Sequence, residues 1–303
     1  MTAVGVDVGG TKILAAAFGA GDQEARVESV TPIGRPGDLV AAITAAVGTI
    51  RNRLDEPITG VGIGIPGRVD TAGGTVRGAV NLGLGAQPLE IAALVGRQLS
   101  VVCHVDNDVN CAALGAFELL RRQLAGDELV YLSIGTGLAA GVILDGKVRR
   151  GQRGLAGEIG HLPMDGDRKC RCGLNGCLEV VASGETLARQ WPTTDGLPAA
   201  QALVAAVAAG DRGATQVLAE FATHLADAVH VLAVTYDVEP IIVGGGVADA
   251  GEPLLDAVRS VLRERESASD FARALALSER LLLKPDGPVG AIGAAALVRQ
   301  EGS

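Results

Sequence analysis

Residues 4–11 read VGVDVGGT, and residues 130–137 read VYLSIGTG. Each stretch is an apolar run that ends in a Gly/Thr turn and leads directly into a second apolar run. Short apolar runs that alternate with helical spacing predict an α/β fold. Because the same strand–turn–strand unit opens each half of the chain, we expect two similar lobes that face each other across a cleft.

The elements around these two units follow from hydrophobic periodicity and turn residues. We expect strands at Val4–Val8, Ile13–Phe18, Ala25–Thr31, Val61–Ile65, Val101–Val105, Leu129–Ile134, Leu138–Leu144 and Pro240–Val243. We expect helices at Leu39–Leu54, Leu89–Leu99, Asp108–Leu120, Pro198–Ala208, Thr215–Val234 and Val289–Arg299. Asp38 is the expected N-cap of the first helix. Gly151–Glu179, rich in Gly, Cys and charge, is expected to be a loop.

Length and charge narrow the class of protein. A chain of 303 residues predicts two domains, at roughly 100–200 residues each. The 26 Lys and Arg against 35 Asp and Glu give a net charge of -9, which argues against a nucleic-acid or anionic-membrane surface. One Trp, two Tyr and four Phe leave little for a base-stacking platform, so a polar ligand must be recognised by hydrogen bonds.

The cell compartment is predicted from what the sequence lacks and from its cysteines. The N-terminus does not read as a signal peptide, and no apolar run reaches the roughly 18 residues of a membrane span. Five cysteines, three of them within residues 170–177, fit a reducing compartment and a metal site better than disulfides. We therefore expect a cytoplasmic protein with no membrane and no nucleic-acid partner.

The first Gly/Thr turn is a candidate phosphate cradle. Gly9 and Gly10 let backbone N–H groups approach an anion, Thr11 adds a hydroxyl and Lys12 adds a cation. Asp7, at the end of the strand, is placed to hold Mg²⁺ through water. The alternative is a tight hairpin with a surface lysine, since the spacing matches neither a Walker A loop nor a Rossmann motif.

Two further glycine patches extend this interpretation. Gly135, Thr136 and Gly137 form the candidate second phosphate cradle. A third patch, Gly244–Gly246 (Gly244, Gly245, Gly246), follows the strand at Pro240–Val243, and ligands approach the carboxyl ends of strands in α/β sheets. Taken alone, the third patch is equally well explained as a plain strand-to-helix turn.

Residues 105–110, Val-Asp-Asn-Asp-Val-Asn, straddle a strand end and a helix start. Asp106 or Asp108 could cap the helix, and on composition alone this local role is favoured. The functional interpretation makes one of these carboxylates a general base for a substrate hydroxyl.

The cysteine cluster is the most specific pattern. His161, Cys170, Cys172 and Cys177 match a closed tetrahedral Cys₃His zinc site, which leaves no open position and is therefore structural. The alternative is a chance cluster of thiols. Cys103 and Cys111 are expected in the core.

Two carboxylates flank the cysteine cluster. Glu158 and Glu179 lie at either end of it, and a metal-pinned loop could hold both toward the hydroxyls of a sugar. The alternative is that both glutamates are solvated loop charges.

Together these motifs resemble the ROK (repressor, open reading frame, kinase) family of bacterial sugar kinases over nearly the whole chain. The resemblance implies the two-lobed actin-like ATPase (ribonuclease H-like) fold with duplicated βββαβα-type lobes around a central cleft. It places residues 1–107, with the C-terminal helix at about 289–303, in the N-terminal lobe, and residues 108–288 in the C-terminal lobe. Gly244–Gly246 then resembles the adenosine motif.

The resemblance also implies residue roles and shifts the interpretation of Asp108 from cap to general base. Asn81, Asn107, Glu158, His161 and Glu179 match the family's sugar contacts, and His161 is expected to bind zinc through one ring nitrogen only. ATP, catalytic Mg²⁺ and structural Zn²⁺ are the implied cofactors.

A glucokinase that forms glucose 6-phosphate is the activity that the resemblance favours. The alternatives are an N-acetylmannosamine or N-acetylglucosamine kinase, a fructokinase, or a non-catalytic sugar sensor. Family regulators carry an added helix-turn-helix region, for which no room is expected before Asp7. A homodimer or higher homo-oligomer is expected by analogy.

Overall fold

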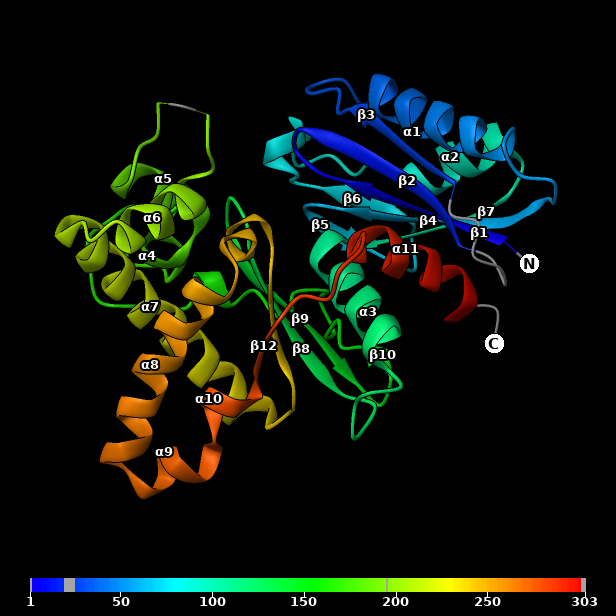
Figure 1. Ribbon diagram of the computed structural model, residues 1–303. Coiled ribbons are helices and arrows are strands. Elements are labelled where there is room, and N and C mark those ends of the chain that lie inside the picture. Colours follow the sequence, from blue (N-terminus) through cyan, green and yellow to red (C-terminus); the bar gives the residue numbers. More distant parts are fainter. Residues whose placement is uncertain (1, 19–24, 195, 301–303) are drawn as a thin grey trace. The chain divides into compact units, whose positions relative to one another are not determined.

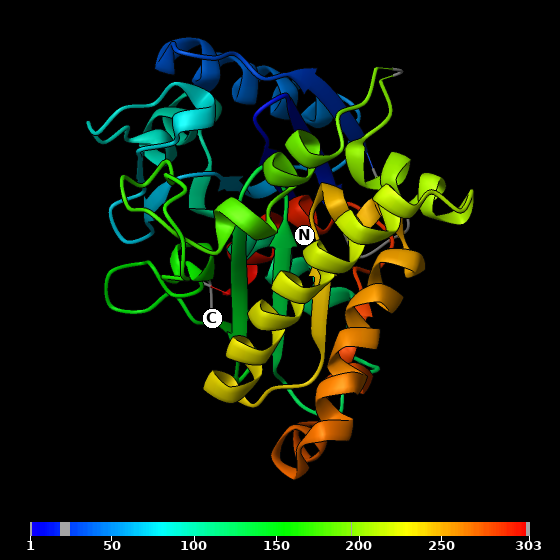
Figure 2. The same cartoon turned by 90° about the vertical axis from the view of Figure 1, so that its left-hand side faces the viewer.

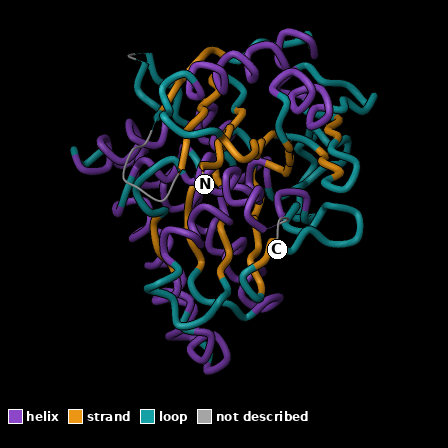
Figure 3. The backbone as a smooth tube through the Cα atoms, turned by 90° about the vertical axis from the view of Figure 1, so that its right-hand side faces the viewer, coloured by secondary structure: helices purple, strands orange, loops and turns teal. Residues whose placement is uncertain are grey.

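The computed structural model describes residues 2–18, 25–194 and 196–300 (Figure 1). The chain divides into two compact units, each an α/β assembly (Figure 3). The first unit comprises Met1–Ala125, Ile143–Ala156 and Pro285–Ser303, and the second comprises Gly126–Val142 and Gly157–Lys284. These units group residues 108–125 and 143–156 with the N-terminal segment. The functional lobe boundaries expected from the sequence stay a prediction.

The first unit is built on a five-stranded sheet of order β3-β2-β1-β4-β7. β1 pairs antiparallel with β2, and β4 lies parallel to both β1 and β7. The strands are β1 (Thr2–Val8), β2 (Lys12–Phe18), β3 (Arg26–Val30), β4 (Ile58–Ile65) and β7 (Val102–Asn107). A small hairpin of β5 (Arg68–Asp70) and β6 (Thr75–Arg77) follows β4.

Helices cover both faces of this sheet because its strands are apolar on both sides. Val4, Val6 and Ile13 pack in one core with α1 (Pro36–Arg51) and α2 (Ile91–Leu99). On the opposite face, Leu14 and Ala16 pack against α11 (Val289–Gln300), which also contacts α3 (Asp108–Leu120).

Small residues allow α11 to approach the sheet closely. A Cβ at Gly5 would collide with the carbonyl oxygen of Ala291, and one at Gly62 would collide with that of Ala294. These are backbone atoms, which cannot swing aside as a side chain can. The two strand glycines therefore fix the distance between sheet and helix.

We expect Gly62→Ala to lower the free energy of unfolding by about 3 kcal/mol, the upper end of the usual cost of overpacking a core, because the Cβ would meet backbone atoms. Gly48→Ala is the matched control, because Gly48 lies within α1 and a Cβ there meets nothing within 4 Å. This control should stabilise the protein by about 0.5–1 kcal/mol through helix propensity. Urea unfolding of both variants measures the difference, and equal effects would contradict the packing account.

The second five-stranded sheet has the order β10-β9-β8-β11-β12 and repeats the topology of the first. In both sheets the first strand of the strand–turn–strand unit is central, with its hairpin partner on one side and a parallel strand on the other. The strands are β8 (Leu129–Ile134), β9 (Leu138–Leu144), β10 (Lys147–Val148), β11 (Ile241–Gly244) and β12 (Leu281–Leu283). The duplication expected from the two turns is confirmed.

The helices of the second unit are dominated by α7 (Arg212–Tyr236), which lies beside α8 (Glu252–Ala268) (Figure 2). Shorter helices complete the unit, namely α4 (Glu179–Ala182), α5 (Gly184–Gln190), α6 (Ala199–Ala208), α9 (Asp270–Leu275) and α10 (Leu277–Arg280). Within the described ranges, α7 is the helix long and apolar enough to span a membrane, which the sequence analysis did not expect. Half of its apolar window is buried inside the fold, as in the core helix of a globular protein.

Most predicted elements are confirmed. Three match residue for residue: the helix Asp108–Leu120 and the strands Leu129–Ile134 and Leu138–Leu144. The predicted start of the first helix is wrong. α1 begins at Pro36 after Arg35, and Asp38 lies inside the first turn. Proline at the first helical position needs no amide partner, which explains the earlier start.

Candidate active site

The carboxyl ends of three parallel strands bring the first group of candidate residues together. Asp7 on β1 lies opposite Gly64 on β4, and Gly64 lies opposite Asp106 on β7. Adjacent strands are about 4.8 Å apart, so the two aspartates are separated by one narrow glycine position. Asp7, Asp106 and Asp108 all act electrostatically on the buried thiol of Cys111, whose pKa is raised first by burial and then by these charges.

Asp7 is a poorly hydrated carboxylate. Burial raises its pKa from 3.8 to about 6, and the charge of Lys12 opposes this only in part. The Lys12 ammonium lies 3.6 Å from Glu28 Oε1, so its charge is shared with another acid. A carboxylate with too little compensating charge suits a cation, and oxygen is the ligand that Mg²⁺ prefers. Asp7 therefore fits the magnesium role expected for it.

Because the folded pKa of Asp7 is raised, its ionisation costs stability as the pH rises from about 4 through 6. Asp7→Asn removes that cost. At pH 8 we expect the free energy of unfolding of this variant to exceed that of the parent by up to about 3 kcal/mol. This figure is the pKa shift of Asp7 converted at about 1.36 kcal/mol per pKa unit. Near pH 3 the gap should close, because the parent carboxyl is then neutral in both states. Denaturant titrations at the two pH values test this, and a gap independent of pH would contradict it.

The first glycine turn is held by backbone bonds. The Gly9 N–H donates to the Lys12 carbonyl at 2.9 Å, and the Thr31 hydroxyl donates to the Gly9 carbonyl at 2.8 Å. A Cβ at Gly10 would lie 3.6 Å from Cβ of Asn81, which is in the 3₁₀ turn η1 (Val80–Leu82). The predicted phosphate turn and the predicted sugar ligand Asn81 are thus neighbours within the first unit.

The capping interpretation of the two aspartates is wrong. Asn107 is the N-cap of α3, and its side-chain oxygen accepts from the N–H groups of Val109 at 2.9 Å and Asn110 at 3.4 Å. Asp106 is buried and is used structurally. Its carboxylate accepts from the Asn107 N–H at 2.7 Å, from Asn110 Nδ2 at 3.0 Å and from Arg150 Nε at 2.7 Å.

Asp108 is the first residue of α3 and is half-buried. It is the one acid of this segment that neither caps the helix nor belongs to the Asp106–Arg150 pair. An acidic side chain in the first turn of a helix is stabilising, because it lies at the positive end of the helix dipole. A carboxylate is also one of the groups that can act as a general base.

In the second unit the other two glycine patches lie side by side. β8 and β11 are parallel, and Ser133 on β8 lies opposite Gly244. A Cβ at Gly245, whose φ is 78°, would collide with the backbone of Ile134, immediately before the Gly135–Gly137 turn. The Gly184 N–H donates to the Gly135 carbonyl at 2.8 Å. These turns form one backbone-lined edge suited to the phosphates of a nucleotide.

The predicted metal ligands converge. The ligand atoms of His161, Cys170, Cys172 and Cys177 all lie within 4.8 Å of one another. The Cys170 sulfur is 3.7 Å from His161 Nδ1, and the Cys172 and Cys177 sulfurs are 3.6 Å apart. Tetrahedral zinc with bonds of about 2.0–2.3 Å requires ligand separations of about 3.5–3.8 Å. The donor set and these two separations therefore fit structural zinc.

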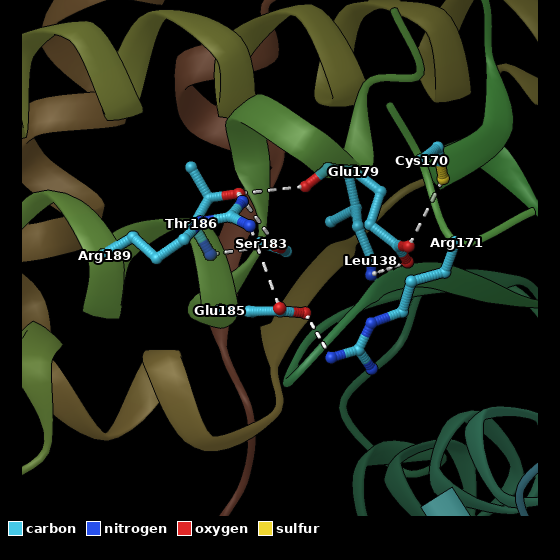
Figure 4. A network of polar contacts seen from close by, with 8 residues as sticks. All are labelled: Leu138, Cys170, Arg171, Glu179, Ser183, Glu185, Thr186 and Arg189. Carbon is cyan, nitrogen blue, oxygen red and sulfur yellow. Dashed lines mark hydrogen bonds and ion pairs between the residues drawn. The ribbon is translucent and has the colours of Figure 1, made fainter. Parts of the chain in front are cut away.

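A network of polar contacts adjoins this cluster through Cys170 and Glu179 (Figure 4). Glu179 opens α4, and its Oε2 accepts from the Leu138 N–H at 3.1 Å while its Oε1 is 3.8 Å from the Cys170 sulfur. His161 directs Nδ1 to the metal cluster and keeps Nε2 3.9 Å from Glu158 Oε2, as expected for a ring that binds metal through one nitrogen. Partial desolvation raises the pKa of Glu158; His161 opposes the shift and Glu179 adds to it.

The predicted site residues are thus divided between the units. The first unit holds Asp7, Gly9, Gly10, Thr11, Lys12, Asn81, Asn107 and Asp108. The second holds Gly135–Gly137, Glu158, His161, the three cysteines, Glu179 and Gly244–Gly246. Sequence reasoning missed Arg150 and the Leu138 amide. Arg150 lies 44 residues from its partner Asp106, and a backbone N–H carries no residue-type signal.

Known proteins resemble this chain over nearly its whole length. Residues 3–301 match the family model described as ROK family. A glucokinase of Halalkalibacterium halodurans is 32% identical over 98% of this chain and 95% of its own. An N-acetylmannosamine kinase of Yersinia pseudotuberculosis is 32% identical over 80% of this chain and 82% of its own. The solved ROK family glucokinase of Streptomyces griseus, in complex with glucose and AMPPNP, is 31% identical, with TM-score 0.80, over 99% of this chain and 100% of its own.

The fold is therefore the two-lobed actin-like fold, and the class of enzyme is the sugar kinases. The chain belongs to the ROK family.

Proposed function

We propose that this sugar kinase transfers the γ-phosphoryl group of ATP to the 6-hydroxyl of a hexose, and that glucose is the preferred acceptor. The observation that carries the proposal is the position of Asp108, a half-buried acid at the first residue of α3, directly after the carboxyl end of β7. Ligands approach this end of the strands in α/β sheets. The glucokinase relatives, aligned over nearly the whole chain, support glucose as the acceptor.

In the proposed reaction, Asp108 takes the proton of the 6-hydroxyl as that oxygen attacks the γ-phosphorus. The new O–P bond forms as the bond from phosphorus to the β–γ bridging oxygen breaks, and ADP leaves with that oxygen. Asp7 would hold Mg²⁺, which would supply positive charge to offset that of the phosphates. The glycine turns donate backbone N–H groups and Lys12 adds a positive charge, because phosphoryl transfer depends mainly on positioning and electrostatics.

Sugar recognition is assigned to Asn81, Asn107, Glu158, His161 and Glu179. Glu179 is well suited, because its carboxylate is fixed by the Leu138 amide and by the adjoining metal cluster. A fixed carboxylate can accept two hydroxyl hydrogen bonds, whose partners then discriminate between sugars. Zinc at His161, Cys170, Cys172 and Cys177 would hold this loop in place.

An N-acetylmannosamine kinase is the second candidate, since a relative of that name matches at the same identity over four fifths of this chain. The residues assigned to the sugar hydroxyls would serve either substrate. The two proposals differ at the 2-substituent, where an N-acetyl group needs more space and an amide partner.

We also propose a cytoplasmic, homo-oligomeric enzyme. None of the five cysteines forms a disulfide in the described structure, which fits a reducing compartment.

A substrate panel tests the proposal. Glucose, mannose, fructose, N-acetylglucosamine and N-acetylmannosamine are each supplied with ATP or with polyphosphate, and sugar phosphate is measured directly. We expect the highest kcat/KM for glucose with ATP. A higher value for N-acetylmannosamine would select the second candidate. Sugar binding without any phosphorylated product would identify a non-catalytic sensor.

A further inference from the structure

A second polar cavity lies entirely within the first unit. It has a volume of about 530 Å³, within the range of small-molecule sites, and lies between the β5–β6 hairpin and the segment after β10. Four arginines line it: Arg68, Arg77, Arg150 and Arg153. No role in the proposed phosphoryl transfer requires such a concentration of positive charge.

Two of these arginines occupy directly opposite positions on the β5–β6 hairpin. In the β5–β6 register Arg68 lies directly opposite Arg77, and Val69 lies opposite Val76. The valines are buried, so alternation along the strands places both arginines on the other, cavity-lining face. Like charges directly opposite on a hairpin are destabilising. An anion bound between the two guanidinium groups would turn this repulsion into attraction.

The charge inside the cavity is only partly balanced. Arg150 is neutralised by Asp106. Asp70 also lines the cavity, and its Oδ1 accepts from the Gly73 N–H. Across residues 2–18, 25–194 and 196–300, the guanidinium groups of Arg68, Arg77 and Arg153 have no hydrogen-bond or ion-pair partner. The cavity therefore carries an excess of positive charge in a protein whose net charge is -9.

We propose that this cavity binds a small molecule through a phosphate monoester group. A carboxylate carries one charge and two oxygens, which a single guanidinium fork already satisfies. A phosphate monoester carries nearly two charges and three terminal oxygens. It therefore matches a cavity lined by three exposed arginines whose guanidinium groups have no counter-ion among the described residues.

The cavity is connected to the catalytic segment by hydrogen bonds. Its lining includes Asp106, Asn107 and Asn110, and Arg150 holds Asp106 at 2.7 Å. Asp106 in turn accepts from the Asn107 N–H, at the residue that caps α3 and precedes Asp108. An anion that draws Arg150 toward itself loosens this pair, so the bound ligand adjusts the kinase. This effect on activity rests on the proposed function, whereas binding does not.

Calorimetry with inorganic phosphate as the probe tests binding, with the ionic strength held constant by chloride. Saturating glucose and Mg-AMPPNP are present to fill the proposed sugar and nucleotide sites. We expect Arg68→Gln with Arg77→Gln to weaken phosphate binding at least tenfold, one charged hydrogen bond being worth about that factor. Arg212→Gln with Arg263→Gln is the control of equal charge change outside the cavity, and should bind phosphate as the parent does.

Thermal unfolding separates binding from a structural effect. Without phosphate, the Arg68→Gln, Arg77→Gln variant should melt at the parent temperature or above it, because like-charge repulsion is removed. With phosphate, the parent and the control should gain Tm and this variant should not. If the double variant fails to fold, Arg153→Gln alone should still weaken phosphate binding.

Equal phosphate affinity in parent and cavity variants, or no binding to the parent, would overturn the proposal. Because these readouts need no turnover, an enzyme inactive on every sugar would refute the proposed function and leave this site standing. Conversely, a fully active kinase with no phosphate bound here would refute this site alone.

Discussion

Asp108→Asn should lower kcat by about 10²–10⁴-fold while the dissociation constant for the sugar changes little. General-base catalysis contributes a factor of this size. The amide keeps the shape of the carboxylate and can still donate or accept a hydrogen bond to a hydroxyl, but it cannot take a proton. Steady-state kinetics give kcat, and calorimetry with the sugar gives affinity independently of turnover.

The matched control is Asp38→Asn. Asp38 lies in the first turn of α1 as Asp108 lies in the first turn of α3, so both changes remove an acid from the positive end of a helix. The helix-dipole loss, about 0.3–1 kcal/mol, is therefore common to both. Activity near the parent value in Asp108→Asn, or an equal loss in both variants, would remove Asp108 from the role of base.

Cys172→Ser should abolish zinc binding at the His161, Cys170, Cys172 and Cys177 cluster and destabilise residues 158–179 around it. Structural zinc contributes an apparent 10–16 kcal/mol of folding free energy in small zinc domains, so the loss of one ligand is expected to cost several kcal/mol locally. Cys172 is exposed, unlike Cys170 and Cys177, so the substitution itself leaves no cavity in the core. The zinc content, the Tm and the affinity for glucose should all decrease together.

Cys103→Ser is the control for this change. Cys103 is a half-buried free thiol on β7 that lies outside the metal cluster. We expect its zinc content and glucose affinity to match the parent. If Cys172→Ser keeps both its metal and its affinity, the cluster does not support residues 158–179, and Glu179 must be held in place by the Leu138 amide alone.

The sequence predicted the fold well where local patterns dominate. The two Gly/Thr turns indicated both central hairpins because apolar runs and turn glycines are local signals. The Cys₃His spacing indicated a cluster that the structure does assemble. The sequence predicted α1 less well, because Asp38 is a good cap by type while Pro36 decides where the helix begins.

Pairings between segments that are distant in the sequence could not be predicted from it. By residue type, any of Asp106, Asn107 and Asp108 can cap a helix. Only the fold shows that Arg150 donates a hydrogen bond to Asp106 and that the Asn107 side chain caps α3. The same holds for Arg68 and Arg77, whose opposition depends on the register of a hairpin that the periodicity did not reveal. Register and long-range ion pairs are set by tertiary packing, which single-residue propensities do not encode.

A crystal structure of the complex with glucose and AMPPNP would show whether Asp108 reaches the reacting hydroxyl. We expect a carboxylate oxygen of Asp108 within about 2.6–3.2 Å of the glucose 6-hydroxyl, the reach of a general base. We also expect this hydroxyl to face the γ-phosphate. A complex in which Asp108 points away from the sugar, with another acid on the 6-hydroxyl, would contradict its proposed role.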